Sequence, residues 1–206
     1  CLSLAGLEVA VVDVDYFALQ NCFELGYPEM TAQTVALIDV GARFSGINIC
    51  KAGQSLFTGD IAVGGRVFTE VLAEGLGVPV DEAEKIKKKA DRGALASKVE
   101  DLLSRKIDSV ASEFNRQLSL FWNASGAEEG VDHIMLSGGG SLMPGLIPAL
   151  RQKTGIECSV MDPLRGISCG ASFDQAYLKE LGPQAGVCMG LGLRQPGDKE
   201  FPDYEY

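Results

Sequence analysis

The 206-residue sequence predicts an α/β fold in which a mixed β-sheet is flanked by helices. Three observations lead to this fold class. Short valine- and isoleucine-rich segments alternate with segments of helical periodicity, two of the buried segments run straight into glycine turns, and one long amphipathic helix carries a single apolar stripe. Ligands of open α/β sheets bind beyond the ends of such strands, so the two glycine turns mark the region of a candidate site.

The first part of the chain is predicted to form two strands, a helix and a hairpin. In chain order, these are a buried strand over residues 8–15, a helix over 16–25 that is capped by Asp15 and ends at Gly26, a buried strand over 34–41, and a hairpin over 45–63 that turns at Ala52-Gly53.

Helices dominate the second part. The prediction is a helix over 66–76 opened by Gly64-Gly65, a short charged helix after Pro79, a long helix over about 95–122, a strand over 131–136, a helix over 144–155, a strand over 156–161 and two short helices on either side of Gly182-Pro183. The long helix is expected to bury one stripe, formed by Val99, Leu102, Leu103, Ile107, Val110, Phe114, Leu118 and Phe121.

Composition excludes several classes of partner. The net charge of −10 and a pI near 4.6 argue against direct binding of nucleic acid or of anionic membrane surfaces. No apolar run approaches the length of a membrane span, so direct membrane insertion is not expected. With one histidine and no CxxC pair, a zinc site is not expected either.

The first candidate motif is Asp39-Val40-Gly41-Ala42, at the end of a predicted strand. A bare carboxylate repels phosphate, so Asp39 suits a phosphate site only with a magnesium ion and its waters in between. Gly41 would let backbone N–H groups approach a phosphate. The simpler alternative is an ordinary strand end with an Asx-type turn.

The second candidate is the run Gly138-Gly139-Gly140, which follows the strand over 131–136. It fits neither the GxxxxGK[ST] phosphate loop nor the GxGxxG dinucleotide pattern. Three glycines in a row would let a ligand lie directly against the backbone, but they also occur in a tight strand-to-helix turn that binds nothing.

The third candidate is the pair Glu84 and Lys87, three residues apart and therefore on one helical face. A solvated ion pair is the usual meaning of this spacing. A carboxylate that accepts from ribose hydroxyls beside an ammonium donor would have the same spacing.

The order of these elements resembles the second half of the actin-like (ribonuclease H-like) ATPase fold, and specifically the PilM family of type IV pilus assembly. The segments that carry the resemblance cover residues 5–194; they are AGLEVAVVDVDYFAL, ALIDVGARFSGINICKAGQSLFTGDIAVGG, DEAEKIKK, HIMLSGGGSLMPGL and PQAGVCMGLGLR. The resemblance implies a second lobe of a two-lobe fold, with ATP and magnesium as ligands.

The resemblance also implies a role for each candidate residue. Asp39 would hold magnesium through water, and N–H groups near Gly41 and Ala42 would reach the phosphates. Gly138, Gly139 and Gly140 would form the adenosine loop. Gly64 and Gly65 would line the same cleft, and Glu84 with Lys87 would hold the ribose. Gly190 would belong to the helix that returns to the other lobe.

On this basis the chain divides into parts of the family fold. Residues 1–26 would be the last strand and connecting helix of the first lobe, 27–62 and 95–194 the base of the second lobe, 63–94 a short helical insert, and 195–206 a flexible tail. The first lobe's DxGxxxxK-like phosphate loop has no match here, so we expect a piece of a longer protein. Without that loop, ATP should bind only at roughly millimolar concentration, and exposed apolar surface should favour self-association.

The implied function is a cytoplasmic nucleotide-binding scaffold that reaches the inner membrane through partners, chiefly the cytoplasmic tail of a PilN-like protein. That tail's groove lies largely in the first lobe, so its docking on this chain alone stays open. Hydrolysis is expected to be slow or absent, because only Gln20 and Asn21 offer polar groups to orient water. The alternatives are an FtsA-like cell-division homologue, an actin-superfamily kinase or ATPase fragment, and a scaffold without nucleotide.

Overall fold

The computed structural model describes residues 2–9, 11–89, 92–125, 130–170 and 172–195. Its strands are β1 (Val35–Val40), β2 (Ser45–Lys51), β3 (Gln54–Ile61), β4 (His133–Ser137) and β5 (Glu157–Val160). They form one sheet in the order β3-β2-β1-β4-β5, in which β1, β4 and β5 are parallel and the β1-β2 and β2-β3 pairs are antiparallel. The predicted mixed sheet is therefore confirmed.

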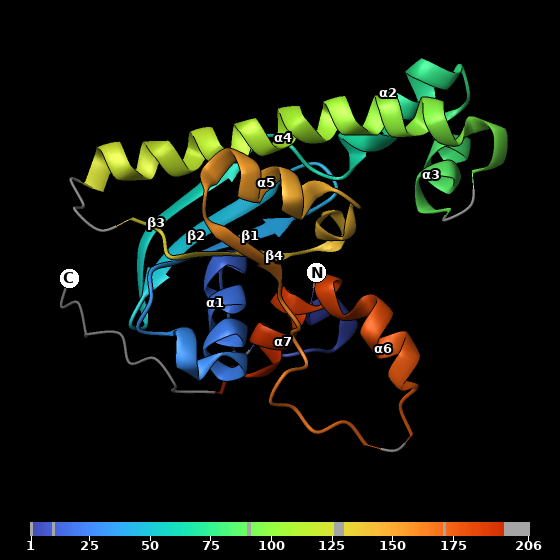
Figure 1. The fold of residues 1–206 in the computed structure, drawn as a ribbon. Coiled ribbons are helices and arrows are strands. Elements are labelled where there is room, and N and C mark those ends of the chain that lie inside the picture. The colour runs from blue at the N-terminus through green and yellow to red at the C-terminus, as the bar shows by residue number, and fades with distance from the viewer. Residues whose placement is uncertain (1, 10, 90–91, 126–129, 171, 196–206) are drawn as a thin grey trace.

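Helices cover both faces of this sheet. They are α1 (Asp15–Gly26), α2 (Arg66–Leu76), α3 (Val80–Lys88), α4 (Ala96–Ser125), α5 (Leu146–Thr154), α6 (Gln175–Leu181) and α7 (Gly186–Gly192). Figure 1 shows α4 and α5 on one face of the sheet and α1 and α7 on the other, with α2 and α3 packed near one end of α4. Nearly all predicted elements are confirmed to within a few residues.

The strand pleat divides the apolar side chains between two cores. Alternate residues of β1 point to opposite faces, so Ile38 joins the larger core under α2, α4 and α5, while Leu37 joins the smaller core under α1 and α7. The smaller core also contains Phe23 of α1, whose ring stacks on Tyr27 with centroids 5.9 Å apart.

The long helix buries the stripe that its periodicity predicts. Its buried members are Val99, Leu103, Ile107, Val110, Phe114 and Leu118. Leu102 is only partly buried and packs against α2 at Gly75, where an added Cβ would lie 2.5 Å from a Leu102 methyl carbon. Phe121 lies outside the residues whose side chains are described.

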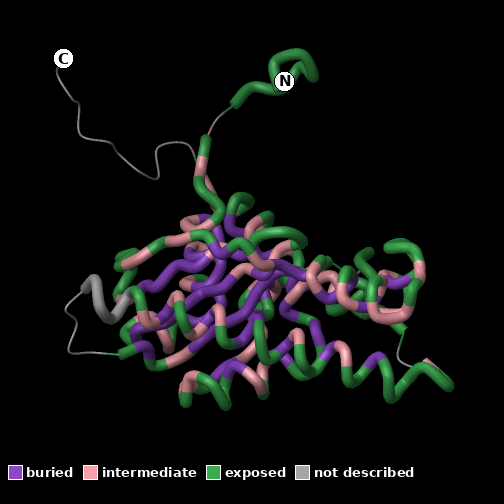
Figure 2. The backbone as a smooth tube through the Cα atoms, turned by 90° about the horizontal axis from the view of Figure 1, so that it is seen from above, coloured by how far each residue is buried: buried purple, intermediate pink, exposed green. Residues whose placement is uncertain are grey.

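The prediction for residues 8–15 is wrong. The described residues of this segment form no strand and are largely exposed, with Val12 at 87%; Figure 2 shows the segment projecting from the rest of the fold. A valine-rich strand needs a neighbour for its backbone hydrogen bonds, and this segment meets neither edge strand of the sheet. Asp15 is the first residue of α1 rather than its cap, and Val14 in the cap position makes no side-chain hydrogen bond.

Helices α1 and α7 touch through their backbones. A Cβ at Gly190 would overlap the carbonyl of Ala18, and one at Gly186 would lie 2.6 Å from the Ser137 hydroxyl and 2.7 Å from a Leu19 methyl carbon. Both positions therefore need glycine for packing. The predicted flexible tail lies outside the described residues from residue 196 onward.

We expect Gly190→Ala to destabilise the fold, because the added methyl must push α7 away from α1. Overpacking of this kind costs about 2 kcal/mol or more, which corresponds to a fall in Tm of about 4–8 °C for a chain of this size. Gly192→Ala in the same helix meets open space and should cause no loss. Equal melting temperatures of the two variants would contradict the packing described here.

Candidate functional site

Four strands bring polar residues into one row across the sheet. Asp39 of β1 pairs with Ser137 of β4 on one side and with Gly46 of β2 on the other, and Gly46 pairs with Asp60 of β3. Directly opposed residues present their side chains on the same face. The carboxylates of Asp39 and Asp60 therefore share the α1 face, with only a glycine between them.

A β-bulge decides that Asp60 faces this way. The hairpin pairs Cys50 with Ser55, but the next pair is Ile49 with Phe57, so Leu56 has no counterpart on β2. One extra residue moves every later side chain of the strand to the opposite face. Without the bulge, Asp60 would point away from Asp39.

The start of α1 closes one side of this row. The ring of Tyr16 lies on Gly46, where a Cβ would be 2.6 Å from a ring carbon. The Tyr16 hydroxyl donates to Asp60, and burial, with the neighbouring carboxylate second, raises the pKa of Tyr16 to about 12. The buried amide of Asn48 donates to the Tyr16 carbonyl over 3.2 Å and to Gln20 Oε1 over 2.9 Å. These contacts fix α1 against β2 and β3.

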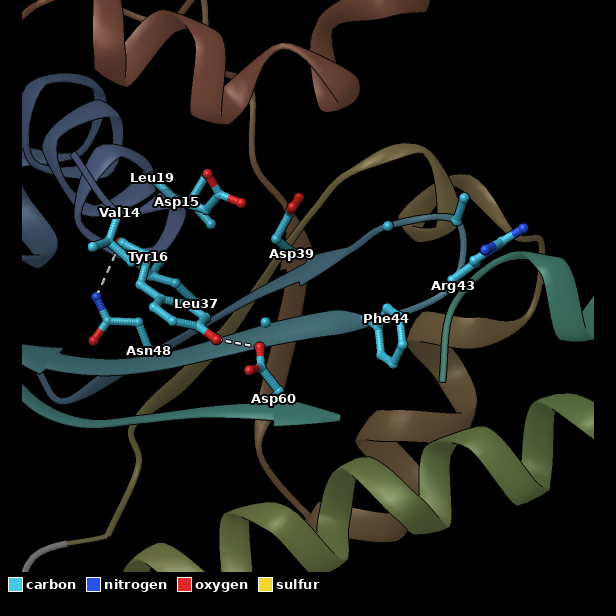
Figure 3. A pocket seen from close by; sticks show the side chains of 13 residues that line it. Val14, Asp15, Tyr16, Leu19, Leu37, Asp39, Arg43, Phe44, Asn48 and Asp60 are labelled. Atoms are coloured by element: carbon cyan, nitrogen blue, oxygen red, sulfur yellow. Dashed lines mark hydrogen bonds between the residues drawn. The ribbon is translucent and has the colours of Figure 1, made fainter. Parts of the chain in front are cut away.

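Between α1 and the end of β1 lies a pocket of about 580 Å³. Its lining includes Asp15, Asp39 and Asp60, together with the turn that holds Arg43 and Phe44. Figure 3 shows the carboxylates of Asp15 and Asp39 in the same open space. The pocket has the size of a small-molecule site, and two facing carboxylates suit a hydrated divalent cation, which prefers oxygen ligands and keeps much of its water.

The ionisation of Asp39 is disfavoured in this setting. Burial raises the pKa of the Asp39 carboxyl, the hydroxyl of Ser137 counteracts part of that, and the negative charge of Asp15 raises the pKa further. A cation between Asp15 and Asp39 would remove this repulsion. The described residues contain no group of three or more histidine, cysteine or acidic side chains placed to bind a metal directly.

The turn after β1 is bound to the start of α2 by its backbone. Gly65 donates to the Gly41 carbonyl and Arg66 to the Ala42 carbonyl, both over 2.8 Å, and a Cβ on Gly64 would lie 2.6 Å from the Ala42 carbonyl carbon. The N–H of Gly41 donates to the Phe44 carbonyl inside the turn. Of the two N–H groups predicted to face a phosphate, that of Ala42 is the one with no acceptor among the described residues.

The triple glycine follows β4 and lies against the end of β1. Gly138 has φ 79° and ψ 163°, and its Cβ would lie 2.5 Å from the Val40 carbonyl oxygen; a Cβ on Gly140 would overlap the Val40 side chain. Gly139 differs, because it is exposed and an added Cβ would meet only the flexible side chain of Gln184. The Cγ of Gln184 would lie 3.3 Å from that Cβ. Two of the three glycines are thus required by packing, while the third leaves a bare backbone surface.

Glu84 and Lys87 form the predicted ion pair, with 2.7 Å between Nζ and Oε2. The Lys87 ammonium also donates to Thr69 Oγ1 over 2.9 Å and to the Gly65 carbonyl over 3.4 Å. Hydrogen bonds from Lys87 and Thr69 outweigh burial and lower the pKa of Glu84 to about 2. All three N–H groups of Lys87 are engaged, whereas Glu84 remains 36% exposed and can accept further bonds.

The structure brings most of the predicted residues together. Gly65 adjoins both Gly41 and Gly140, so three turns from distant parts of the sequence meet at the carboxyl ends of β1 and β4, and Lys87 reaches this junction through Gly65. Asp39 lies close to this junction, on the α1 face of the sheet, where it lines the pocket.

Sequence reasoning missed Asp15, Tyr16 and Asp60, all of which line the pocket. Asp15 is the last residue of the segment predicted as a strand, where its carboxylate has the position of a helix cap. The Asp39–Gly46–Asp60 row depends on the bulge, which the sequence does not reveal. Gln20 and Asn21, the residues predicted to orient water, do not line the pocket. Gln20 is 6% exposed and bonds Asn48 and Glu24, and the buried Nδ2 of Asn21 has no partner among the described residues.

Comparison with known proteins points to one family. A family model described as type IV pilus assembly protein PilM matches residues 1–196. Among curated proteins, the ethanolamine utilization protein EutJ of Salmonella typhimurium is 26% identical over 152 residues, which are 74% of this chain and 47% of EutJ. The chain therefore spans about half the length of the curated relatives it matches.

None of the described helices is both long and apolar enough to span a membrane.

Solved structures show the same fold. The PilM–PilN type IV pilus biogenesis complex superimposes with a TM-score of 0.79 at 24% identity, covering 92% of this chain and 54% of the other. EutJ of Carboxydothermus hydrogenoformans gives 0.62 at 18% identity, covering 92% and 59%. MreB5 of Spiroplasma citri bound to ADP gives 0.61 at 12% identity, covering 93% and 61%. The fold is thus an actin-like one.

The three glycines should differ in their tolerance of a methyl group. Gly138→Ala combines a left-handed backbone with a clash against Val40 and should cost about 3 kcal/mol, or about 6–12 °C in Tm. Gly139→Ala should change stability by less than about 0.5 kcal/mol, because only a flexible side chain must move. Thermal unfolding measures both, and a loss at Gly139 equal to that at Gly138 would overturn the assignment of their roles.

The raised pKa of Asp39 predicts a pH-dependent gain from Asp39→Asn. Since the folded state holds the Asp39 proton more tightly, ionisation opposes folding; the effect is absent below the ordinary carboxyl pKa of about 3.9 and complete above the raised pKa. The variant should melt at a higher temperature than wild type at pH 8 and at the same temperature near pH 3.5. Asp101→Asn, which removes an exposed ion pair to Arg105, should give no gain at pH 8. A lower Tm for Asp39→Asn at pH 8 would contradict the electrostatics.

Proposed function

Because the chain belongs to the PilM family of type IV pilus assembly proteins, we propose that it is a nucleotide-binding scaffold that works in the cytoplasm and couples to an inner-membrane pilus complex. Its ligand is ATP with magnesium. The chain spans 54% of the PilM chain in the PilM–PilN complex, so the proposal concerns the whole protein of which these residues form the described lobe.

One observation carries the nucleotide proposal: three glycine turns meet beside a pocket that holds two facing carboxylates. The exposed backbone of Gly139 offers a flat surface to a nucleoside, and the Ala42 N–H offers a donor to a phosphate. A scaffold without nucleotide would have no need of an exposed Gly139 or of an unfavourable Asp39. The ADP complex of MreB5 supports the same ligand class.

The magnesium ion would be held through water by Asp39, with Asp15 facing it across the pocket. When bound, the ion supplies positive charge against the phosphates. The chain itself sets the position of the carboxylate that faces the ion. Asp39 is fixed at the end of β1 by its pairing with Ser137 and Gly46, so it needs no rearrangement to take its place.

The ribose would be held by Glu84. Its carboxylate remains partly exposed and ionised, and it can accept from a ribose hydroxyl. Lys87 has every N–H engaged and acts instead as the group that positions Glu84 and ties it to Gly65. In this proposal only Glu84 contacts the ribose, whereas the sequence predicted a ribose contact for both residues.

We propose that hydrolysis is slow or absent. A water-orienting group near the terminal phosphate is required for rapid turnover, and of the two amides predicted for this role, neither lines the pocket and Gln20 is buried with both ends bonded. Membrane association would come through a PilN-like cytoplasmic tail, as the PilM–PilN complex suggests.

Magnesium ATP should raise the Tm of the chain. At a dissociation constant near 1 mM, 10 mM ligand stabilises the fold by about 1.4 kcal/mol, or about 3–6 °C. Gly139→Val should abolish the shift while leaving the unliganded Tm nearly unchanged, because the new side chain takes the place of the nucleoside. In Asp39→Asn, the Tm shift caused by ATP should be the same with and without magnesium.

Three results would contradict the proposal. The first is the absence of any shift with ATP, ADP or adenosine in both this chain and the whole protein. The second is unaltered binding by Gly139→Val. The third is turnover of the whole protein at about 1 s⁻¹ or faster, the range of ordinary enzymes, which would replace a scaffold by an active ATPase.

A further inference from the structure

A buried ion pair joins the segment before α1 to the end of α7. Arg194 Nη1 donates to Asp13 Oδ2, and the two side chains are only 10% and 5% exposed. The valines on either side of Asp13 point outward instead, with Val12 87% and Val14 47% exposed. The segment therefore buries its carboxylate and exposes its apolar side chains, which is the reverse of what the hydrophobic effect alone would select.

The pair holds the chain at the entry to α1. Besides the Arg194 guanidinium, the Asp13 carboxylate accepts the Val14 N–H through Oδ1 over 2.9 Å. Val14 occupies the N-cap position of α1 and makes no capping hydrogen bond with its side chain. At the other end of the pair, the backbone N–H of Arg194 donates to the Leu191 carbonyl in the last turn of α7 over 3.1 Å. One ion pair thus fixes the start of α1 relative to the end of α7.

Asp15, the first residue of α1, lies between two anchors. Two residues before it the chain is fixed by the ion pair, and directly after it the Tyr16 hydroxyl donates to Asp60. The Asp15 carboxylate has no hydrogen-bonding partner among the described residues, yet it faces Asp39 across the pocket (Figure 3). Two like charges in one pocket repel each other, so an exposed carboxylate on an unanchored backbone would turn away.

We propose that the Asp13–Arg194 ion pair is a positioning device that holds Asp15 toward the divalent cation; this inference rests on the proposed function. Neither Asp13 nor Arg194 lines the pocket, so both act through the backbone at the start of α1. Residues that support metal-facing groups in this way typically change metal affinity about tenfold or more when they are replaced. Because Arg194 lies two residues beyond α7, the cation site also depends on where that helix ends.

The test uses the sign of the effect of one charge. The dissociation constant of ATP is measured for this chain by NMR titration with and without magnesium, and the factor by which magnesium tightens ATP binding is the readout. Arg194→Gln should lose most of the wild-type factor, up to about tenfold, because Asp15 loses its position. If the guanidinium acted through its charge alone, its removal would leave the pocket more negative and would increase the factor instead.

A double variant separates position from charge. Asp13→Asn combined with Arg194→Met keeps the net charge of the chain and an acceptor for the Val14 N–H. It leaves no unpaired charge buried, so it should fold even where Arg194→Gln does not, and it should lose the magnesium factor to the same extent. The matched control is Asp101→Asn with Arg105→Met, which removes an exposed ion pair of α4 with the same charge balance and should keep the wild-type factor.

Adenosine, which carries no phosphate and needs no magnesium, should bind all of these variants as it binds wild type. A magnesium factor that keeps its wild-type value in the double variant, or that grows in Arg194→Gln, would overturn this inference and leave the proposed function standing. An equal loss of adenosine affinity would do the same, because the pair would then support the lobe as a whole rather than the cation. If the wild-type chain and the whole protein bind no nucleotide, both the inference and the proposed function fail.

Discussion

The architecture of the site depends on backbone meeting backbone. The turns after β1, before α2 and after β4 lie against one another at Gly41, Gly64, Gly65 and Gly140, and the neighbours of Gly64 and Gly65 are backbone atoms. A single Cβ at Gly64 or Gly140 would separate these turns by more than any nearby side chain could accommodate. The same principle continues on the other side of the sheet, where Gly186 and Gly190 let α7 lie directly on Ser137 and α1. Glycine here is first a packing residue, and only at Gly139 does it leave a surface open.

Electrostatics give this rigid arrangement its chemical character. The pocket collects the carboxylates of Asp15, Asp39 and Asp60 on one face of a sheet, and Asp60 is satisfied by the Tyr16 hydroxyl. The Ser137 hydroxyl compensates Asp39 only in part, so the folded state keeps a repulsion between Asp39 and Asp15 that a cation can relieve. Unfavourable charge interactions of this kind are common at binding sites, because the bound ligand compensates for them.

Most of the fold could be predicted from the sequence, because its periodicities are strong. The α4 stripe, the hairpin turn at Ala52-Gly53 and the two strands that end in glycine all depend on local pattern. Two features were missed for the same reason: strand pairing joins residues that are far apart in the sequence. Residues 8–15 have the composition of a strand but meet no partner in the sheet, and the unpaired Leu56, which turns Asp60 toward the pocket, leaves no mark in an alternating sequence. The predicted site residues come together in the fold, but coordinates were required to tell the glycines that packing demands, Gly138 and Gly140, from Gly139, which is exposed.

Helix α4 has a mechanical consequence. Its 30 residues extend about 45 Å, with one part against α5 and the sheet and another against α2. Leu102 locks into the groove at Gly75 of α2, and α2 carries Thr69, which holds Glu84 and Lys87. Helix α4 thus connects the sheet side of the fold with α2, which in turn packs against α3. The positions of Glu84 and Lys87 relative to the sheet therefore depend on a helix contact in which neither residue takes part.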